Sequence, residues 1–261
     1  MFRSLHIAAT GMTAQEMNLE GISNNIANAN TTGYKKERVD FQDLLYQTVR
    51  AAGTQTAATA QSPTGLQLGS GVRAAGTSRS FSQGPTVVTT NPLDVAIEGN
   101  GFFVVQQPDG TPAYTRAGNL QTNAQGQIVT SEGYALEPSL TIPPDAQGVT
   151  IGADGTVSVT LANQSQPTQL GQLTIAAFVN PAGLHALGHN LFKQTAASGD
   201  PQVGAPGTEG RGTLLQGSLE RANVDVVEEM IGLIGAQRAY EINSKVITAA
   251  DEMLRAATQL R

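Results

Sequence analysis

Apolar side chains recur at alternating steps of three and four residues at both ends of this 261-residue chain. The N-terminal series has one polar member, Gln15, and its apolar members are Leu5, Ala8, Met12, Leu19, Ile22, Ile26 and Ala29. This spacing places the series on one face of a helix, as in the seam of a coiled coil. The pattern therefore predicts an N-terminal helix, which should end near the turn-forming residues 30–33.

The C-terminal segment carries two such stripes on one predicted helix. The first stripe comprises Ala239, Ile242, Val246, Ala249, Met253, Ala256 and Leu260, and the second stripe comprises Met230, Leu233, Tyr240, Ile247 and Leu254. Asp225 can cap the start of this helix, with Glu228 three residues later as in a capping box. Two stripes give the helix more apolar surface than one partner helix can cover.

The surplus apolar surface has two possible destinations. It could be buried within the subunit, as in an ordinary helical hairpin or bundle, or between neighbouring copies of the chain. A β-rich insert separates the two helical segments, which favours burial between copies. The expected assembly interface comprises Leu5, Met12, Leu19, Ile22, Ile26, Met230, Leu233, Tyr240, Ile242, Val246, Met253 and Leu260.

Turn signals recur every 8–14 residues through the middle of the chain, which is typical of antiparallel sheets. The predicted hairpins pair residues 102–107 with 112–116, 120–122 with 127–130, and 149–151 with 156–161, and residues 173–179 form a further predicted strand. The expected fold class is α+β. Residues 1–45 and 225–261 form a coiled-coil-like helical domain, residues 46–80 an extended arm or hairpin, and residues 81–224 a central antiparallel all-β domain.

The arm is rich in Ala, Gly, Thr, Gln and Ser and is too long for an ordinary connection. A turn at residues 63–65 could fold it into a hairpin, with Leu66, Leu68 and Val72 as modest apolar anchors. We expect the arm to brace neighbouring subunits in an assembly. A flexible spacer without contacts is the alternative that its composition leaves open.

Composition narrows the classes of function. The net charge of −6 and the absence of tryptophan argue against a nucleic-acid partner, because such proteins normally carry a basic stripe or stacking aromatics. Cysteine is absent, so neither disulfides nor thiolate sites can form. No apolar run approaches the roughly 20 residues that span a bilayer, so membrane insertion is not expected. The N-terminus also lacks the apolar core of a secretory signal, so export would need another route.

The sequence predicts no catalytic, metal or cofactor site. His185 and His189 have the spacing of two ligands on a helix, but glycines interrupt that stretch and the expectation is surface-loop histidines. Glu98, Glu132 and Glu137 could in principle act as paired carboxylates of a hydrolase. Solvated strand ends are the expectation for these acids, because nothing in the sequence places them together.

Three separated motifs resemble those of the bacterial flagellar axial proteins, the rod and hook subunits. Residues 24–35 (NNIANANTTGYK) are similar to the N-terminal signature of this family, and residues 222–241 to its C-terminal signature. Residues 93–103 and 114–118 resemble its shared β domain, so that the similarity covers nearly the whole chain. The family-motif residues on which the resemblance depends are Asn28, Asn30, Thr32, Gly33, Tyr34, Lys35, Gln237 and Arg238.

Within the family, the resemblance is closest to the distal rod subunits. Hook subunits usually carry a further outer domain, for which this chain has no room. The Gln-, Thr- and Gly-rich segment 46–80 is similar to a stretch that distinguishes distal rod subunits. A proximal rod subunit remains an alternative. A secreted β-domain adhesin or carbohydrate-binding protein is the alternative from another class.

The resemblance implies a structural subunit, not an enzyme, that polymerises into the distal rod of the basal body. The rod would transmit torque from motor to hook and surround the export channel. The implied partners are other copies, proximal rod proteins, the hook protein, the P- and L-ring proteins and the flagellar type III export apparatus. The implied location is the basal body across the periplasm, reached without a cleavable signal peptide. In the motif, Asn28 and Asn30 should hydrogen-bond turn backbone, and Gly33 should adopt a positive φ.

Overall fold

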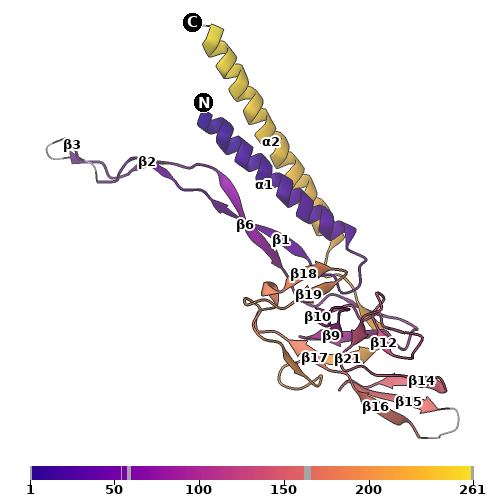
Figure 1. Ribbon diagram of the computed structural model, residues 1–261. Coiled ribbons are helices and arrows are strands. Elements are labelled where there is room, and N and C mark those ends of the chain that lie inside the picture. The colour runs from indigo at the N-terminus through magenta and orange to yellow at the C-terminus, as the bar shows by residue number, and fades with distance from the viewer. Residues whose placement is uncertain (1, 54, 58–59, 162–165, 260–261) are drawn as a thin grey trace. The chain divides into compact units, whose positions relative to one another are not determined.

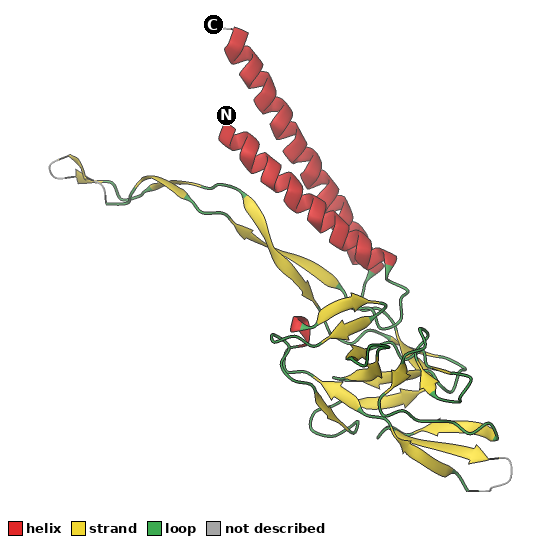
Figure 2. Cartoon of the chain, in the orientation of Figure 1, coloured by secondary structure: helices red, strands yellow, loops and turns green. Residues whose placement is uncertain are grey.

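A computed structural model describes residues 2–53, 55–57, 60–161 and 166–259 of the chain (Figures 1 and 2). The chain divides into two compact units. The helical unit comprises Met1–Ala27, Glu37–Ser78 and Asp225–Arg261, and the β unit comprises Asn28–Lys36 and Arg79–Val224. The predicted α+β class, with terminal helices and a central antiparallel region, is confirmed. The sequence-based boundaries at residues 45, 80 and 224 stay a prediction of which parts fold independently.

Helices α1 (Phe2–Ala27) and α2 (Val226–Gln259) lie side by side and antiparallel (Figure 1). Gly11 faces Asn243, and Ile22 faces Gly232. The two contacts are separated by eleven residues on each helix, in opposite directions, so the two antiparallel helices keep the same register between them. The backbone N–H groups of Val227 and Glu228 donate to Asp225 Oδ1 at 2.9 and 3.3 Å, which confirms the predicted cap. Helix α1 ends at Ala27, three residues before the turn at which its end was predicted.

Small side chains line the contact between the two helices. Ala8, Ala14, Ala236 and Ala250 are buried. A Cβ added at Gly11 would lie 3.0 Å from the Asn243 side chain, so a larger residue there would require Asn243 to shift. The helices therefore approach closely, and much of their larger apolar surface stays outside the contact.

The predicted arm, residues 46–80, is part of a longer two-stranded ribbon that begins at residue 37. Strand β1 (Glu37–Asp43) pairs with β6 (Val72–Arg79), β2 (Gln47–Arg50) with β5 (Leu66–Leu68), and β3 (Gln55–Ala57) with β4 (Ala60–Gln61). The predicted reversal at residues 63–65 is wrong, because these residues lie between β4 and β5 on one side of the ribbon. The Ser62 hydroxyl donates to the Thr64 carbonyl at 2.9 Å, so this turn makes a local irregularity in a continuing strand.

Antiparallel sheets build the β unit (Figure 2). The largest sheet contains β9 (Phe102–Gln106), β10 (Pro112–Thr115), β11 (Gln121–Thr122), β12 (Ile128–Val129), β13 (Ala135–Leu136), β17 (Ile175–Ala177), β18 (His185–Gly188), β19 (Leu191–Lys193) and β20 (Gln202–Gly204). A smaller sheet contains β14 (Ala146–Ile151), β15 (Thr156–Leu161) and β16 (Thr168–Gln172). Separate pairs join β8 (Val95–Glu98) to β21 (Thr213–Gln216) and β7 (Thr86–Val88) to β22 (Ser218–Glu220), and a short 3-10 helix spans Pro181–Gly183.

The three predicted hairpins are confirmed, as β9–β10, β11–β12 and β14–β15. The predicted strand at 173–179 corresponds to β17. Strand β9 is buried on both faces: Phe103 and Val105 join one apolar cluster, whereas Phe102 and Val104 join another that includes Tyr114. Burial on both faces explains why its sequence is continuously apolar rather than alternating. Among the described residues, neither helix is long and apolar enough to cross a membrane.

Candidate assembly site

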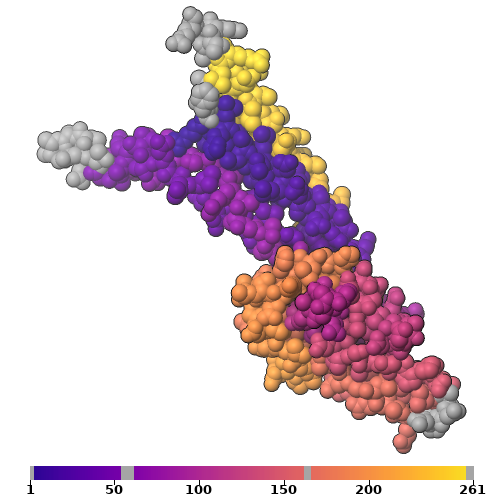
Figure 3. Space-filling model, in the orientation of Figure 1, coloured from indigo at the N-terminus to yellow at the C-terminus, as the bar shows by residue number. Residues whose placement is uncertain are grey.

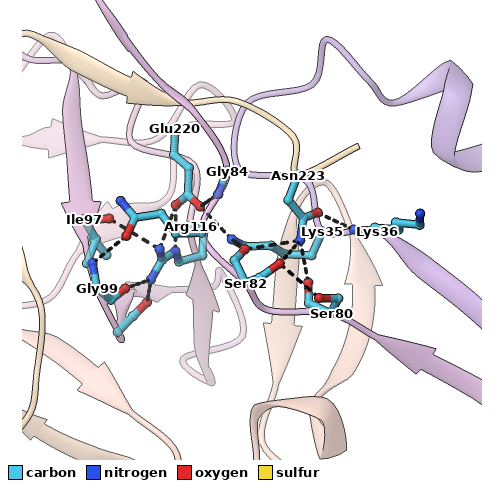
Figure 4. A network of polar contacts seen from close by, with 12 residues as sticks. Lys35, Lys36, Ser80, Ser82, Gly84, Ile97, Gly99, Arg116, Glu220 and Asn223 are labelled. Atoms are coloured by element: carbon cyan, nitrogen blue, oxygen red, sulfur yellow. Dashed lines mark hydrogen bonds and ion pairs between the residues drawn. The ribbon is translucent and has the colours of Figure 1, made fainter. Parts of the chain in front are cut away.

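A buried charge cluster joins three distant parts of the chain within the β unit (Figure 4). Lys35 Nζ lies 2.6 Å from Glu220 Oε1, and Arg116 Nη2 lies 2.8 Å from Glu220 Oε2. The three residues are 1%, 4% and 1% exposed for Lys35, Arg116 and Glu220, respectively. We refer to these three residues as the charge cluster. Because both oxygens of one carboxylate are engaged, the cluster fixes the positions of three segments at once.

The charge cluster holds two cations and one carboxylate, so backbone carbonyls complete its polar contacts. Lys35 Nζ donates to the Ser82 carbonyl at 2.7 Å, and Arg116 Nη1 donates to the carbonyls of Gly99 and Gly101 at 2.7 and 2.8 Å. Burial, and then the Arg116 charge, lower the pKa of Lys35, and the Glu220 carboxylate opposes both effects. The negative charge of the carboxylate therefore offsets the free-energy cost of burying both cations.

The side chain of Asn223 forms a second junction beside the charge cluster (Figure 4). Its Oδ1 accepts from the Lys36 backbone N–H at 2.7 Å, and its Nδ2 donates to the Ser80 carbonyl at 2.9 Å. The Ser80 N–H in turn donates to the Lys36 carbonyl at 2.9 Å. One amide thus connects the residue that follows the N-terminal motif, the end of the arm and the segment that precedes α2.

The family-motif loop packs against the rest of the β unit through Gly33. Gly33 has φ +70°, which confirms the predicted positive φ, and a Cβ there would lie 2.7 Å from the Ala117 backbone nitrogen. The Gly33 N–H donates to the Glu220 carbonyl at 2.8 Å. The loop can approach this closely only because residue 33 has no side chain.

The other residues of the family-motif loop form hydrogen bonds with side chains. Asn28 Oδ1 accepts from the Thr31 hydroxyl at 3.1 Å. Asn30 Oδ1 accepts from Arg221 Nη2 at 2.8 Å, so the expectation that Asn30 would bond turn backbone is wrong. The Thr32 carbonyl accepts from Asn190 Nδ2 at 3.1 Å. Half-buried Tyr34 lines a small cavity beside Lys35.

Asn25 has a similar role in the helical unit. Its Nδ2 donates to the Glu37 carbonyl at 2.8 Å, and its Oδ1 accepts from the Glu37 N–H at 2.9 Å. Nδ2 also lies 3.2 Å from Glu229 Oε2, and both Asn25 and Glu229 are buried. The Asn25 amide both donates to and accepts from the Glu37 backbone, as a neighbouring strand does in a sheet. With its contact to Glu229, it joins α1, β1 and α2.

Three large apolar residues of the first stripe of α2 are exposed in the subunit. Ile242, Val246 and Met253 are 61%, 42% and 54% exposed. Met230 and Tyr240, from the second stripe, are also exposed. Exposed apolar surface of this extent is typical of an interaction site.

The remaining predicted interface residues are less accessible. Leu233 and five residues of α1 are half-buried: Leu5, Met12, Leu19, Ile22 and Ile26. Leu260 lies outside the described residues. The assignment of these twelve residues to an assembly interface stays a prediction. The motif residues Gln237 and Arg238 are exposed on α2.

Sequence reasoning missed part of the exposed apolar surface of α2. Val226, Val227, Ile231 and Ile234 are 41%, 66%, 67% and 49% exposed. Their spacing combines steps of one, three and four, so they broaden the surface instead of extending a single stripe. Val227, Ile231 and Ile234 themselves follow steps of four and three, but this series is short, because the next positions at that spacing are Gln237 and Arg238.

The two candidate metal-ligand histidines lie on the β18–β19 hairpin and not on a helix. His185 begins β18, and His189, with φ 53°, occupies the turn. His189 Nδ1 lies 3.4 Å from Glu132 Oε1 at the surface. Within the part of the chain that the structure describes, no three His, Asp or Glu side chains gather as a metal site requires.

The charge cluster also links the regions that match known families. Residues 5–35, with Lys35, match the family described as "Flagella basal body rod protein". Residues 96–159, with Arg116, match "Flagellar hook protein FlgE/F/G D1 domain". Residues 215–260, with Glu220, match "Flagellar basal body rod FlgEFG protein C-terminal". Each matching region contributes one member of the charge cluster.

Curated relatives match over the full length. The flagellar basal-body rod protein FlgG of Caulobacter vibrioides is 52% identical over 260 residues, which cover 99% of both chains. That of Borreliella burgdorferi is 48% identical over 100% of this chain and 99% of its own. That of Bacillus subtilis is 40% identical over 100% of both chains. The chain belongs to the flagellar basal-body rod protein family.

Proposed function

We propose that this chain is a structural subunit that polymerises into the distal rod of the flagellar basal body. The observation that carries the proposal is the exposed apolar surface of α2 in a chain whose full-length relatives are named rod proteins. A lone subunit leaves this surface in water, and association of copies would remove it. The twelve predicted interface residues are assigned to these contacts between copies.

The two units would contribute differently to such a rod. The helical unit would supply the contacts between copies, since it carries the exposed surface of α2. The β unit would supply stiffness, because its apolar clusters and its charge cluster hold it in one conformation. Torque from the motor would then pass from copy to copy toward the hook.

The rod would contact proximal rod proteins at one end and the hook protein at the other, with P- and L-ring proteins around it. It would span the periplasm, enclose the export channel and receive its subunits through the flagellar type III apparatus. No cofactor is assigned to any of these steps.

Electron microscopy of concentrated purified protein tests the proposal. A rod subunit should form tubes with regular helical order, whereas an adhesin or carbohydrate-binding protein should not. Pull-down on purified peptidoglycan or glycans gives the complementary measurement. Glycan binding without tubes at any concentration would overturn the rod assignment.

The arm should stiffen the tube. Leu45, Tyr46 and Val49 are exposed on it, and an isolated two-stranded ribbon is marginally stable in water. Arg3 anchors the ribbon at β2 and β5, since Nη1 donates to Gln47 Oε1 and Nη2 to the Leu68 carbonyl, both at 2.9 Å. The ribbon beyond this anchor would gain order by packing on a neighbouring copy.

Shortening the arm tests this role. Arg50 pairs with Leu66, so residues 51–65 can be replaced by Asn-Gly, which forms a tight two-residue turn. We expect the shortened chain to keep both units folded but to form more bendable tubes, or none. Persistence length from electron micrographs is the measurement, with the unshortened chain as control. Tubes of unchanged stiffness would show that the arm is only a spacer.

A further inference from the structure

A groove runs between α1 and the base of the ribbon in the helical unit (Figure 3, between the indigo helix and the purple strands). Its volume is about 610 Å³. One wall is a single face of α1, with Met17, Glu20, Gly21 and Asn24 at helical spacing. The other side comes from β1 and β6, through Glu37, Val39, Ala74, Ala75, Gly76 and Thr77.

The groove is shaped for a helix with protruding side chains. Its β6 side consists of small residues, and a Cβ added at Gly76 would meet no atom within 4 Å. Met17 and Val39 add apolar contact surface, and Glu20 places an exposed carboxylate on the rim. An apolar trough with an acidic rim suits an amphipathic helix that carries positive charge beside its apolar face.

The first stripe of α2 has this character. Ile242 and Val246 protrude from it. Arg238 and Lys245, four residues before and three after Ile242, are exposed and border the stripe. Ile242, Val246 and Met253 are exposed in the subunit, so this part of the stripe is available to another copy.

We propose that the first stripe of α2 from one copy inserts into the α1 groove of the next, with Arg238 and Lys245 toward the acidic rim. The proposal deepens the proposed function, on which it rests. The groove and the stripe are different surfaces of the helical unit. A contact between the stripe of one copy and the groove of the next is therefore heterologous, or head-to-tail. Such contacts leave a free groove at one end and a free stripe at the other, and they build open helical polymers unless they close into a ring.

The absence of cysteine allows a direct test by cross-linking. Gly76→Cys places one thiol in the groove, and Ala249→Cys places one within the first stripe. The two single-cysteine proteins are mixed under assembly conditions, with one enlarged by a tag, and oxidised. Only a contact between copies can join them, and the joined product has a distinct mass on a denaturing gel.

We expect the mixed disulfide to form at least about tenfold faster than with a control, a ratio equal to about 1.4 kcal/mol. The control replaces Gly76→Cys by Gly148→Cys, another exposed glycine with open space around its Cβ position. Equal rates for the two pairs would overturn the groove contact, whether or not tubes form. Tubes without the cross-link would leave the proposed function standing, whereas a lack of tubes counts against that function itself.

A filled groove gives a second readout. Gly76→Leu should leave the subunit folded, because its side chain enters open space, but it should occupy the groove. We expect assembly to require at least about a tenfold higher concentration, again about 1.4 kcal/mol. Gly148→Leu is the matched control, and circular dichroism checks that both variants fold. Normal assembly of Gly76→Leu would contradict the proposal.

Discussion

Replacing Glu220 by glutamine should lower the free energy of unfolding of the β unit by about 3–5 kcal/mol, the range for removing one partner from a buried ion pair. The substitution keeps the shape of the side chain but leaves Lys35 and Arg116 buried without a counter-charge. The lost carboxylate also accepts the Gly84 N–H at 2.9 Å, a contact that the amide oxygen can retain. Urea denaturation followed by circular dichroism measures the change.

Glu132→Gln is the matched control for this substitution. Glu132 and His189 form a contact at the surface of the same unit, with side chains 47% and 66% exposed. Exposed pairs of this kind contribute about 0–1 kcal/mol. If Glu220→Gln were no more destabilising than Glu132→Gln, the charge cluster would not hold the unit together.

The defect of the Glu220→Gln variant should also depend on pH. Burial and Arg116 already lower the pKa of Lys35 in the native protein, and the variant lacks the carboxylate that opposes them. The folded variant should therefore release the Lys35 proton at a pH where the unfolded chain, with a lysine pKa of about 10.4, keeps it. Stability rises with pH wherever the unfolded state binds more protons. The loss in free energy of unfolding, relative to the native protein, should therefore be smaller at about pH 9 than at about pH 7.

Ile242→Asp should abolish tube formation at concentrations where the native chain assembles. Ile242 is 61% exposed in the subunit, so the change leaves the fold intact. In the assembled state the carboxylate would be buried in the seam, at a cost of several kcal/mol unless it is paired. Because about 1.4 kcal/mol equals a factor of ten, we expect at least about a hundredfold rise in the concentration required. Sedimentation of polymer at increasing concentration measures it.

Ser244→Asp adds the same charge to the same helix as a control. Ser244 is exposed and, two residues from Ile242, lies on a different face of α2. It should assemble nearly as the native chain does. Leu19→Asp is a less selective test, because Leu19 is half-buried and its change would also affect the subunit. Equal assembly of Ile242→Asp and Ser244→Asp would show that the first stripe is not an interface.

Sequence periodicity was sufficient to predict the helices and the main hairpins, because both depend on local spacing. The stripes of α2 follow the helical repeat, and β9 and β10 pair as the predicted hairpin of residues 102–107 and 112–116 requires. The face of α2 that contacts α1 was harder to predict from the sequence. The helices contact through alanine and glycine, and small residues carry little signal in an apolar pattern.

The charge cluster could not be found from the sequence in the same way. Glu220 lies 185 residues from Lys35 and 104 from Arg116, and no local spacing relates them. Lys35 was selected only as part of a motif, and Glu220 was not selected at all. The reversal of the arm was misplaced for a related reason. A Pro-Thr-Gly turn predicts a bend, but only the pairing of the strands shows whether the chain turns back there.

The junction at Asn223 has a mechanical consequence. The chain passes between its two units four times, after residues 27, 36, 78 and 224. Lys36, Ser80 and Asn223 lie within two residues of three of these passages and are hydrogen-bonded to one another. A pull on any one of these three segments is therefore shared with the other two at the edge of the β unit, before it reaches the sheets of that unit. Bonds loaded together in this way yield at a higher force than bonds loaded in turn, so the β unit is protected from being peeled open one strand at a time.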